Sequence, residues 1–142
     1  MKHRRGGLIL DPSTSERMGG IRQKGTAAEL AVRRIATSLG LHYRISNRDL
    51  PGSPDLANRS RKWAIFVHGC FWHRHAGCSR TTTPRRNRAF WVAKFEANIA
   101  RDARVQSELR DLGYRVVVLW ECEVEREAQA VGYRVGALAS TS

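Results

Sequence analysis

The sequence predicts one mixed α/β domain in which helices cover a central β-sheet, and three observations indicate this fold class. The chain has 142 residues, which is enough for one domain with a sizeable core. Two nearly apolar segments, 63–68 (WAIFVH) and 114–120 (YRVVVLW), have the composition of strands buried on both faces. Helical patterns precede, separate and follow these segments, which is the order expected of a layered α/β protein.

The first helix is predicted to begin after Thr26. Glu29 lies three residues further on, which is the spacing of a capping box, and apolar residues between 27 and 39 repeat with helical periodicity. Gly40 then favours the left-handed conformation that ends many helices. We therefore expect a helix that ends just before Gly40.

The segments that follow are predicted to be extended or turns. Residues 42–46 (HYRIS) read as a strand. Residues 50–55 (LPGSPD) read as a turn, because two prolines and a glycine exclude a helix there. Residues 63–68 are then expected to form the central strand, and 81–86 a polar loop.

A long helix is predicted over about 87–112, closed by Gly113, and a last helix over about 124–138. Steps of four and three residues define a core-facing seam on the long helix. This seam consists of Trp91, Phe95, Asn98, Asp102, Val105, Leu109 and Leu112. Because a carboxylate on such a seam must be paired or bound, Asp102 should contact His68 or His73, or form an ordinary ion pair with an arginine.

The charge of the chain predicts a polyanionic partner. Lys and Arg number 25 against 13 Asp and Glu, so the net charge is +12. Nucleic acid is the leading candidate and an anionic membrane surface the lesser one. No stretch has the pattern of a signal peptide or a membrane span, so we expect a cytoplasmic protein. Residues 1–25 are expected to form a basic, partly flexible arm ahead of a single domain over 26–142.

Cysteine and histidine positions suggest a zinc site. Cys70, His75 and Cys78 lie in one loop, and Cys122 follows the second apolar strand. If the two strands are neighbours in the sheet, their ends bring all four side chains together. Three cysteines and one histidine are a common ligand set for structural zinc. The alternative is three buried free thiols and a surface histidine.

Four other polar residues are candidates for catalysis. A metal-dependent nuclease needs a carboxylate for its ion and a group that orients or deprotonates water. Asp55 could hold the ion, with Glu29 nearby, and His68 or His73 could act on water. Each has a simpler reading: Asp55 as a turn residue, Glu29 as part of its helix cap, and the histidines as neighbours of the zinc site.

Aromatic residues bracket an arginine-rich stretch. Five arginines and no acidic residue occur between Arg74 and Arg88. Phe71 and Trp72 lie in a short, polar-flanked loop where burial is difficult, so they are expected to face outward and to stack on bases. Trp91 is on the helix seam, where packing is at least as plausible as contact with DNA.

Taken together, these motifs resemble the very-short-patch-repair (Vsr) DNA mismatch endonucleases of bacteria. The matching segments are PGSPD, FVHGCFWHRH, FWVAKFEANIARD and LGYRVVVLWEC, with a weaker match at RMGGIRQKGTAAE. They span roughly residues 15 to 123. The resemblance implies a restriction-endonuclease-like fold, with a central mixed sheet flanked by helices and one structural zinc site.

The resemblance also implies roles for individual residues. It makes Asp55 the magnesium ligand and His73 the residue acting on water, supported by His68, Asp102 and Glu29. It assigns structural zinc to Cys70, His75, Cys78 and Cys122. It assigns contact with DNA to Phe71, Trp72 and Trp91 at the mismatch, and to Met18 and Ile21 in the opposite groove.

Two departures from the family pattern concern the metal sites. Val67 stands where the best-known members carry threonine, so a magnesium contact there would use its backbone carbonyl. The spacing between the zinc histidine and the next cysteine is one residue longer, with Gly77 in the interval.

The expected function is magnesium-dependent nicking of one DNA strand beside a T:G mismatch, which initiates short-patch mismatch repair. The expected partners are mismatched duplex DNA and other mismatch-repair proteins, with no membrane. The enzyme should be monomeric and associated with the nucleoid when bound to DNA. The alternatives are a nuclease of the same fold with sequence or structure specificity, and a zinc-stapled DNA-binding module without catalysis.

Overall fold

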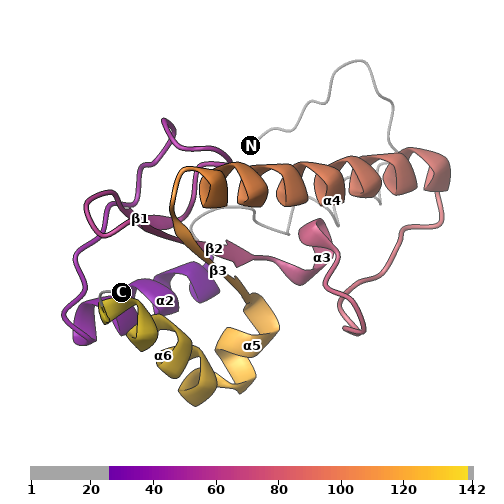
Figure 1. Cartoon of the computed structure of the whole chain (residues 1–142). Helices are drawn as coiled ribbons and strands as arrows, with labels where there is room; N and C mark the ends of the chain where they lie inside the picture. Colours follow the sequence, from indigo (N-terminus) through magenta and orange to yellow (C-terminus); the bar gives the residue numbers. More distant parts are fainter. Residues whose placement is uncertain (1–25, 141–142) are drawn as a thin grey trace.

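A three-stranded mixed sheet forms the centre of the molecule (Figure 1). The computed structural model describes residues 26–140. The central strand β2 (Trp63–His68) pairs antiparallel with β1 (Leu56–Asn58) and parallel with β3 (Arg115–Trp120). Helix α4 (Arg88–Asp111) lies between the two parallel strands in the sequence and makes their crossover connection. The predicted mixed α/β architecture and the central position of β2 are thus confirmed.

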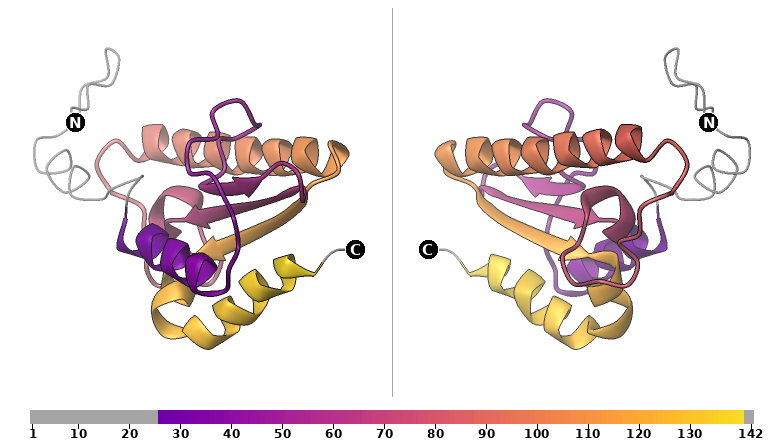
Figure 2. Two further views of the ribbon diagram at one scale, coloured as in Figure 1. Left: turned by 90° about the vertical axis from the view of Figure 1, so that its left-hand side faces the viewer. Right: turned by 90° about the vertical axis from the view of Figure 1, so that its right-hand side faces the viewer.

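Helices cover both faces of this sheet (Figure 2). Helix α4 packs on one face, and α2 (Ala27–Ser38), α5 (Glu121–Arg126) and α6 (Ala128–Gly136) pack on the other. Side chains of β2 alternate between the two cores. Trp63 and Ile65 face the α2 side, and Ala64 and Phe66 face α4. The same alternation sends Val67 toward α2 and His68 toward α4.

The first predicted helix, α2, has the expected limits. The hydroxyl of Thr26 accepts a hydrogen bond from the backbone N–H of Glu29 at 3.1 Å, which caps the helix. The helix ends at Ser38, and Gly40 has a φ of +78°. The 50–55 turn is also present, with Gly52 at φ +74°.

The predicted strand at 42–46 is wrong. Only Arg44 pairs with the sheet, through an isolated antiparallel bridge to Ala57. Its backbone N–H donates to the carbonyl of Ala57 at 2.9 Å and its carbonyl accepts at 3.1 Å. Because β1 has only three residues, its outer edge offers too short a template for a longer ladder.

The long helix is confirmed, with caps at Asn87 and Leu112. Its seam is only partly buried. Leu112 is 52% exposed, because it lies beyond the last helical turn. The seam residues Trp91, Phe95, Val105 and Leu109 are buried, whereas Asn98 and Asp102 are half-buried.

The C-terminal part differs from the prediction in two ways. The apolar sequence of β3 predicts a fully buried strand, but Leu119 is the only buried residue in it. As an edge strand of a three-stranded sheet, it receives less cover. The single helix predicted over 124–138 is two helices, α5 and α6, followed by a 3₁₀ turn (Ala137–Ala139). Glu127, at φ −129° and ψ 48°, interrupts the helical path and lets both helices pack near α2.

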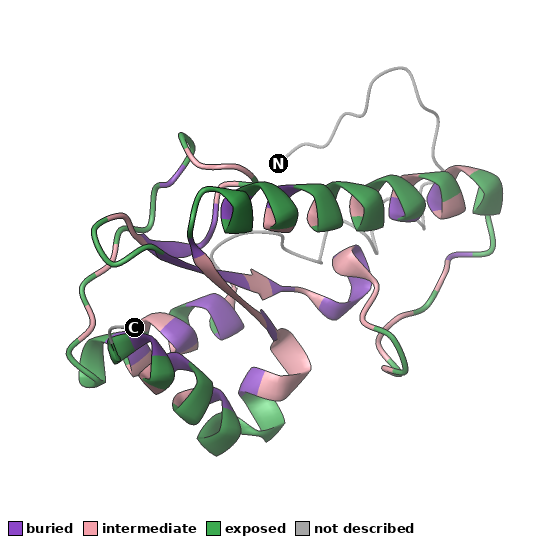
Figure 3. Ribbon diagram, viewed as in Figure 1, coloured by how far each residue is buried: buried purple, intermediate pink, exposed green. Residues whose placement is uncertain are grey.

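The outer face of α4 is exposed along its length (Figure 3). Within residues 26–140, no helix is long and apolar enough to cross a bilayer. Met18, Ile21 and the predicted arm at 1–25 lie outside the described residues.

Candidate functional site

The four predicted zinc ligands converge at the ends of β2 and β3. The ligand atoms of Cys70, His75, Cys78 and Cys122 all lie within 4.8 Å of one another. This follows from the parallel register, which places His68 at the end of β2 beside Trp120 at the end of β3. The loops leaving both strands therefore start side by side.

Distances within the cluster fit a tetrahedral ion. The Sγ atoms of Cys78 and Cys122 are 4.0 Å apart, and the Nδ1 atom of His75 lies 3.4 Å from Cys122 and 3.7 Å from Cys70. Zinc bonds to sulfur of about 2.3 Å at tetrahedral angles would separate two sulfur ligands by about 3.8 Å. Burial raises the pKa of the Cys70 thiol to about 12, so a nearby cation is needed to hold it as thiolate.

Polar contacts hold the loop that carries Cys70, His75 and Cys78, here called the metal loop, against α5. The backbone N–H of Cys70 donates to Glu121 at 2.9 Å. Arg80 donates to Glu125 at 2.6 Å. The hydroxyl of Thr81 donates to the carbonyl of His75 at 2.7 Å. The first two bonds tie the loop to the helix that carries Cys122, and the third closes the loop on itself.

A second polar cluster lies between β2 and α4. The Nδ1 atom of His73 is 2.7 Å from a carboxylate oxygen of Asp102. Of the partners foreseen for Asp102, a histidine is therefore the one observed. The ring of His68 stacks on that of His73 with centroids 3.8 Å apart and planes 5° from parallel.

His68 is buried and is neutral near pH 7. It is 4% exposed, and burial is the main reason that its pKa falls to about 3, with the charge of His73 lowering it further. Its buried Nδ1 atom makes no hydrogen bond within residues 26–140. A metal ion lies in the plane of an imidazole ligand, so two stacked rings do not point at one ion. The cluster of His68, His73 and Asp102 therefore suits proton transfer better than metal binding.

The candidate carboxylates are both buried. Asp55 is 8% exposed and lies just before β1, where its side chain accepts a hydrogen bond from the N–H of Val67 at 2.7 Å. Glu29 is 5% exposed and forms an ion pair with Arg33 at 3.3 Å. Asp55 is thus tied to β2 and Glu29 to α2, which packs on the same strand.

The expectation that Phe71 and Trp72 face outward is wrong. They lie on a short helix, α3 (Cys70–His73), and are 6% and 8% exposed. The Phe71 ring packs edge-on against Phe95 at 5.2 Å, and Trp72 lies 6.4 Å from Trp91. The seam of α4 supplies an apolar partner that the loop sequence alone does not reveal.

The structure adds two residues that the sequence pattern does not single out. The Trp120 ring stacks on His75 at 4.3 Å and forms a T-shaped pair with His68 at 5.1 Å, so it touches both clusters. The Arg74 guanidinium lies 3.8 Å from the centre of the Phe95 ring and donates to the carbonyls of Phe71 and Thr82. Pairing the two apolar strands in parallel register would have indicated Trp120. Arg74 stands out in the sequence only as one end of the arginine-rich stretch, and nothing local indicates that it packs on Phe95.

Comparisons with known proteins find similar sequences among DNA endonucleases. The family described as DNA mismatch endonuclease Vsr matches residues 9–80. The chain is 45% identical over 104 residues to the type II nicking enzyme V.XorIIP of Xanthomonas oryzae, covering 73% of this chain and 76% of the relative. It is 39% identical over 108 residues to the DNA mismatch endonuclease Vsr of Escherichia coli, covering 76% of this chain and 69% of the relative. It is 36% identical over 108 residues to the type II nicking enzyme V.NmeAIP of Neisseria meningitidis (76% and 76%).

Proposed function

The chain belongs to the Vsr family of DNA endonucleases, and we propose that it nicks one strand of duplex DNA beside a T:G mismatch. In this role it would initiate short-patch mismatch repair. The observation that carries the proposal is the pairing of His73 with Asp102 beside a neutral, buried His68. The net charge of +12 suits a nucleic-acid substrate.

Magnesium would be held by the carboxylate of Asp55 and the backbone carbonyl of Val67. The N–H and C=O of one residue in a strand point to the same edge, and the N–H of Val67 points to Asp55. Oxygen ligands of this kind are the ones that magnesium prefers. When bound, the ion supplies positive charge to the phosphoryl oxygen and the leaving group.

His73 is proposed to orient or deprotonate the attacking water. The Nδ1 atom is engaged by Asp102 at 2.7 Å, which leaves Nε2 as the ring nitrogen for proton transfer. Asp102 fixes the orientation of the ring. His68, which is neutral, supports the other face of the interaction by stacking on the His73 ring. Glu29 would complete the acidic side of the site.

Zinc would be structural, held by Cys70, His75, Cys78 and Cys122. Four protein ligands leave no open position for a water molecule. The ion would hold α3, and with it His73, against the end of β3.

The aromatic residues Phe71, Trp72 and Trp91 are proposed to enter the duplex at the mismatch. Because they pack together with Phe95, insertion requires them to leave this cluster. Unstacking a mispaired step costs less than unstacking a paired one, so insertion itself would favour mismatched DNA. Met18 and Ile21 would contact the opposite groove.

We propose further that residues 26–142 form a single catalytic domain preceded by a basic arm at 1–25. The protein would act as a monomer in the bacterial cytoplasm, on nucleoid DNA. Other mismatch-repair proteins would act after the nick.

The decisive experiment compares labelled duplexes that differ only in one T:G or T:A pair, in the presence of magnesium. We expect nicking of the T:G duplex alone. Equal cleavage of both duplexes would contradict mismatch specificity and favour a nuclease with sequence or structure specificity. Binding without any nicking would favour the non-catalytic DNA-binding module.

The matched variants for this experiment are Asp55→Ala and Asp111→Ala. Asp55 is buried beside β2, and Asp111 is exposed at the end of α4. Nicking should be lost in the first variant and retained in the second. Full activity of Asp55→Ala would exclude the proposed magnesium site.

A further inference from the structure

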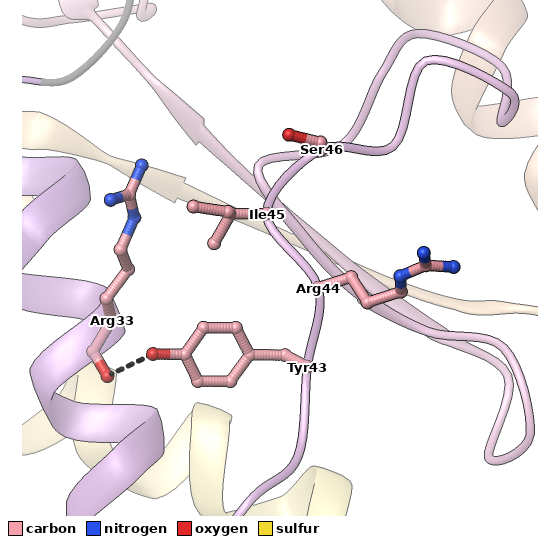
Figure 4. Close-up of a pocket in the computed structure, with 5 residues that line it drawn as sticks. All are labelled: Arg33, Tyr43, Arg44, Ile45 and Ser46. Atoms are coloured by element: carbon pink, nitrogen blue, oxygen red, sulfur yellow. Dashed lines mark hydrogen bonds between the residues drawn. The ribbon is translucent and has the colours of Figure 1, made fainter.

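An open hollow of about 640 Å³ lies between α2 and the segment that precedes β1 (Figure 4). Its lining consists of Arg33, Tyr43, Arg44, Ile45 and Ser46. Figure 4 shows the side chain of Ile45 directed toward α2, whereas the guanidinium of Arg44 points away from Arg33. Arg33 is therefore the charged side chain of the hollow itself.

The hollow adjoins both candidate carboxylates. Arg33 is one helical turn beyond Glu29 and pairs with it at 3.3 Å. On the other side, Asn47, which follows Ser46, donates from its side chain to the carbonyl of Pro54, which precedes Asp55, at 3.0 Å. The segment that lines the hollow therefore runs beside the one that carries Asp55. A strand of DNA that reaches Asp55 and Glu29 would therefore continue directly into the hollow.

The Arg33 side chain has donor capacity to spare. One terminal nitrogen engages Glu29, but the buried Nε atom makes no hydrogen bond within the described part of the chain. A buried donor without a partner is costly, and the planar guanidinium matches phosphate oxygens in geometry and charge. The Tyr43 hydroxyl is already used, since it donates to the carbonyl of Arg33.

The rest of the lining suits a sugar. Ile45 is 50% exposed, so its side chain is accessible to a ligand in the hollow, and Ser46 is also exposed and carries a hydroxyl. A cationic hydrogen-bond donor next to a small apolar surface matches one sugar-phosphate unit, whose phosphate oxygens accept hydrogen bonds. A peptide carboxylate would use Arg33 as well, but it would not lie in line with the phosphodiester to be cut.

We propose that this hollow is a backbone subsite for the cleaved strand, in which Arg33 binds a phosphate close to the scissile one. Ile45 and Ser46 contact the adjoining sugar. The inference rests on the proposed function, because it takes duplex DNA as the substrate. It adds a phosphate-binding residue and a position along the strand.

The test replaces single phosphates with uncharged methylphosphonates along a T:G duplex and measures binding in the absence of magnesium. In the wild-type protein, one substitution within about two nucleotides of the cut should weaken binding about tenfold. In Arg33→Ala the same substitution should have no further effect. In the same variant, the magnitude of the slope of log affinity against log salt concentration should be smaller than in the wild type by about one.

Arg34→Ala is the matched control. Arg34 neighbours Arg33 on α2 but is exposed, and the variant changes the net charge by the same amount. It should keep the methylphosphonate penalty. Arg33→Lys retains the charge but lacks Nε, so it should recover part of the affinity, and it serves if Arg33→Ala does not fold.

Two results would overturn the subsite. One is a wild-type protein that tolerates methylphosphonate at every position near the cut. The other is an Arg33→Ala protein with the full wild-type pattern of penalties. Either result could occur in a protein that still nicks T:G duplexes, whereas loss of mismatch nicking in the wild type would reject the proposed function itself.

Discussion

At the scale of single residues, the stacked pair of His68 and His73 lies at the centre of the proposed active site. His68 and His73 are five residues apart, yet one is buried and neutral and the other is held by a carboxylate. Stacking at 3.8 Å makes the two rings one unit. The position of a residue against α4, and not its type, therefore separates the two roles.

Asp102→Asn should slow nicking by at least about 100-fold, the usual lower range for general acid–base catalysis. The amide keeps the shape of the side chain but removes the negative charge that faces His73. Single-turnover nicking measures the effect, and the affinity for DNA should stay unchanged. Asp111→Asn, at the exposed end of the same helix, should nick at the wild-type rate. A similar loss in both variants would refute the role of Asp102.

Acidification should destabilise the protein through His68. The folded-state pKa is about 3 against an ordinary value of 6.5, so below pH 6.5 the unfolded chain binds a proton that the folded chain does not. Stability is therefore complete above pH 6.5 and is lost as pH falls toward 3. At pH 5 the loss is about 2 kcal/mol.

Comparing the wild type with His68→Gln isolates this effect. Acid also protonates the proposed zinc ligands, but it does so equally in both proteins, so that contribution cancels. Denaturant unfolding at pH 7 and pH 5 should show a smaller decrease in the free energy of unfolding for the variant. An identical decrease in both proteins would mean that His68 does not titrate as described.

At the scale of elements, the junction of β3 and α5 joins the two clusters. Trp120 touches His75 and His68, Glu121 accepts from the N–H of Cys70, and Cys122 belongs to the thiol cluster. Three consecutive residues thus contact three different parts of the 68–78 loop. The parallel register of β2 and β3 is what brings them there.

Trp120→Leu should loosen zinc and slow nicking together. The leucine fills part of the space but cannot stack on His75. Because loss of such supporting contacts commonly lowers metal affinity, we expect the zinc affinity of the variant to fall about 10- to 100-fold. Zinc release to a coloured chelator and single-turnover nicking measure the two effects. Trp120→Phe keeps a ring and should recover both. Unchanged zinc release in Trp120→Leu would exclude the coupling.

At the scale of the whole molecule, the two main hydrophobic cores lie outside the metal loop, which carries Cys70, His75 and Cys78. One core joins the sheet to α2, α5 and α6, and the other joins it to α4. A third, aromatic cluster holds α3 on α4. The metal loop is therefore attached to a fold that is largely complete without it.

Removal of zinc should lower the melting temperature and abolish nicking without unfolding the sheet. Hydrogen exchange should show lost protection in residues 69–83, with β2 and the middle of α4 still protected. Zinc added back should restore nicking. A chelated protein with unchanged stability and exchange would contradict a structural ion.

The sequence by itself determined the elements whose signals are local. Helical periodicity and caps located α2 and α4, and apolar runs located β2 and β3. The clustering of Cys70, His75, Cys78 and Cys122 could also be predicted from the sequence, because a metal site requires particular residue types in sufficient number.

Only the tertiary structure decided what depends on distant surfaces. It buried Phe71 and Trp72, because the seam of α4 faces α3. It reduced segment 42–46 to one bridge, because β1 is short. It stacked His68 on His73 and set Trp120 between the clusters, because the alternation of β2 and its register with β3 fix which faces meet. Such contacts join residues far apart in the chain, and no local pattern encodes them.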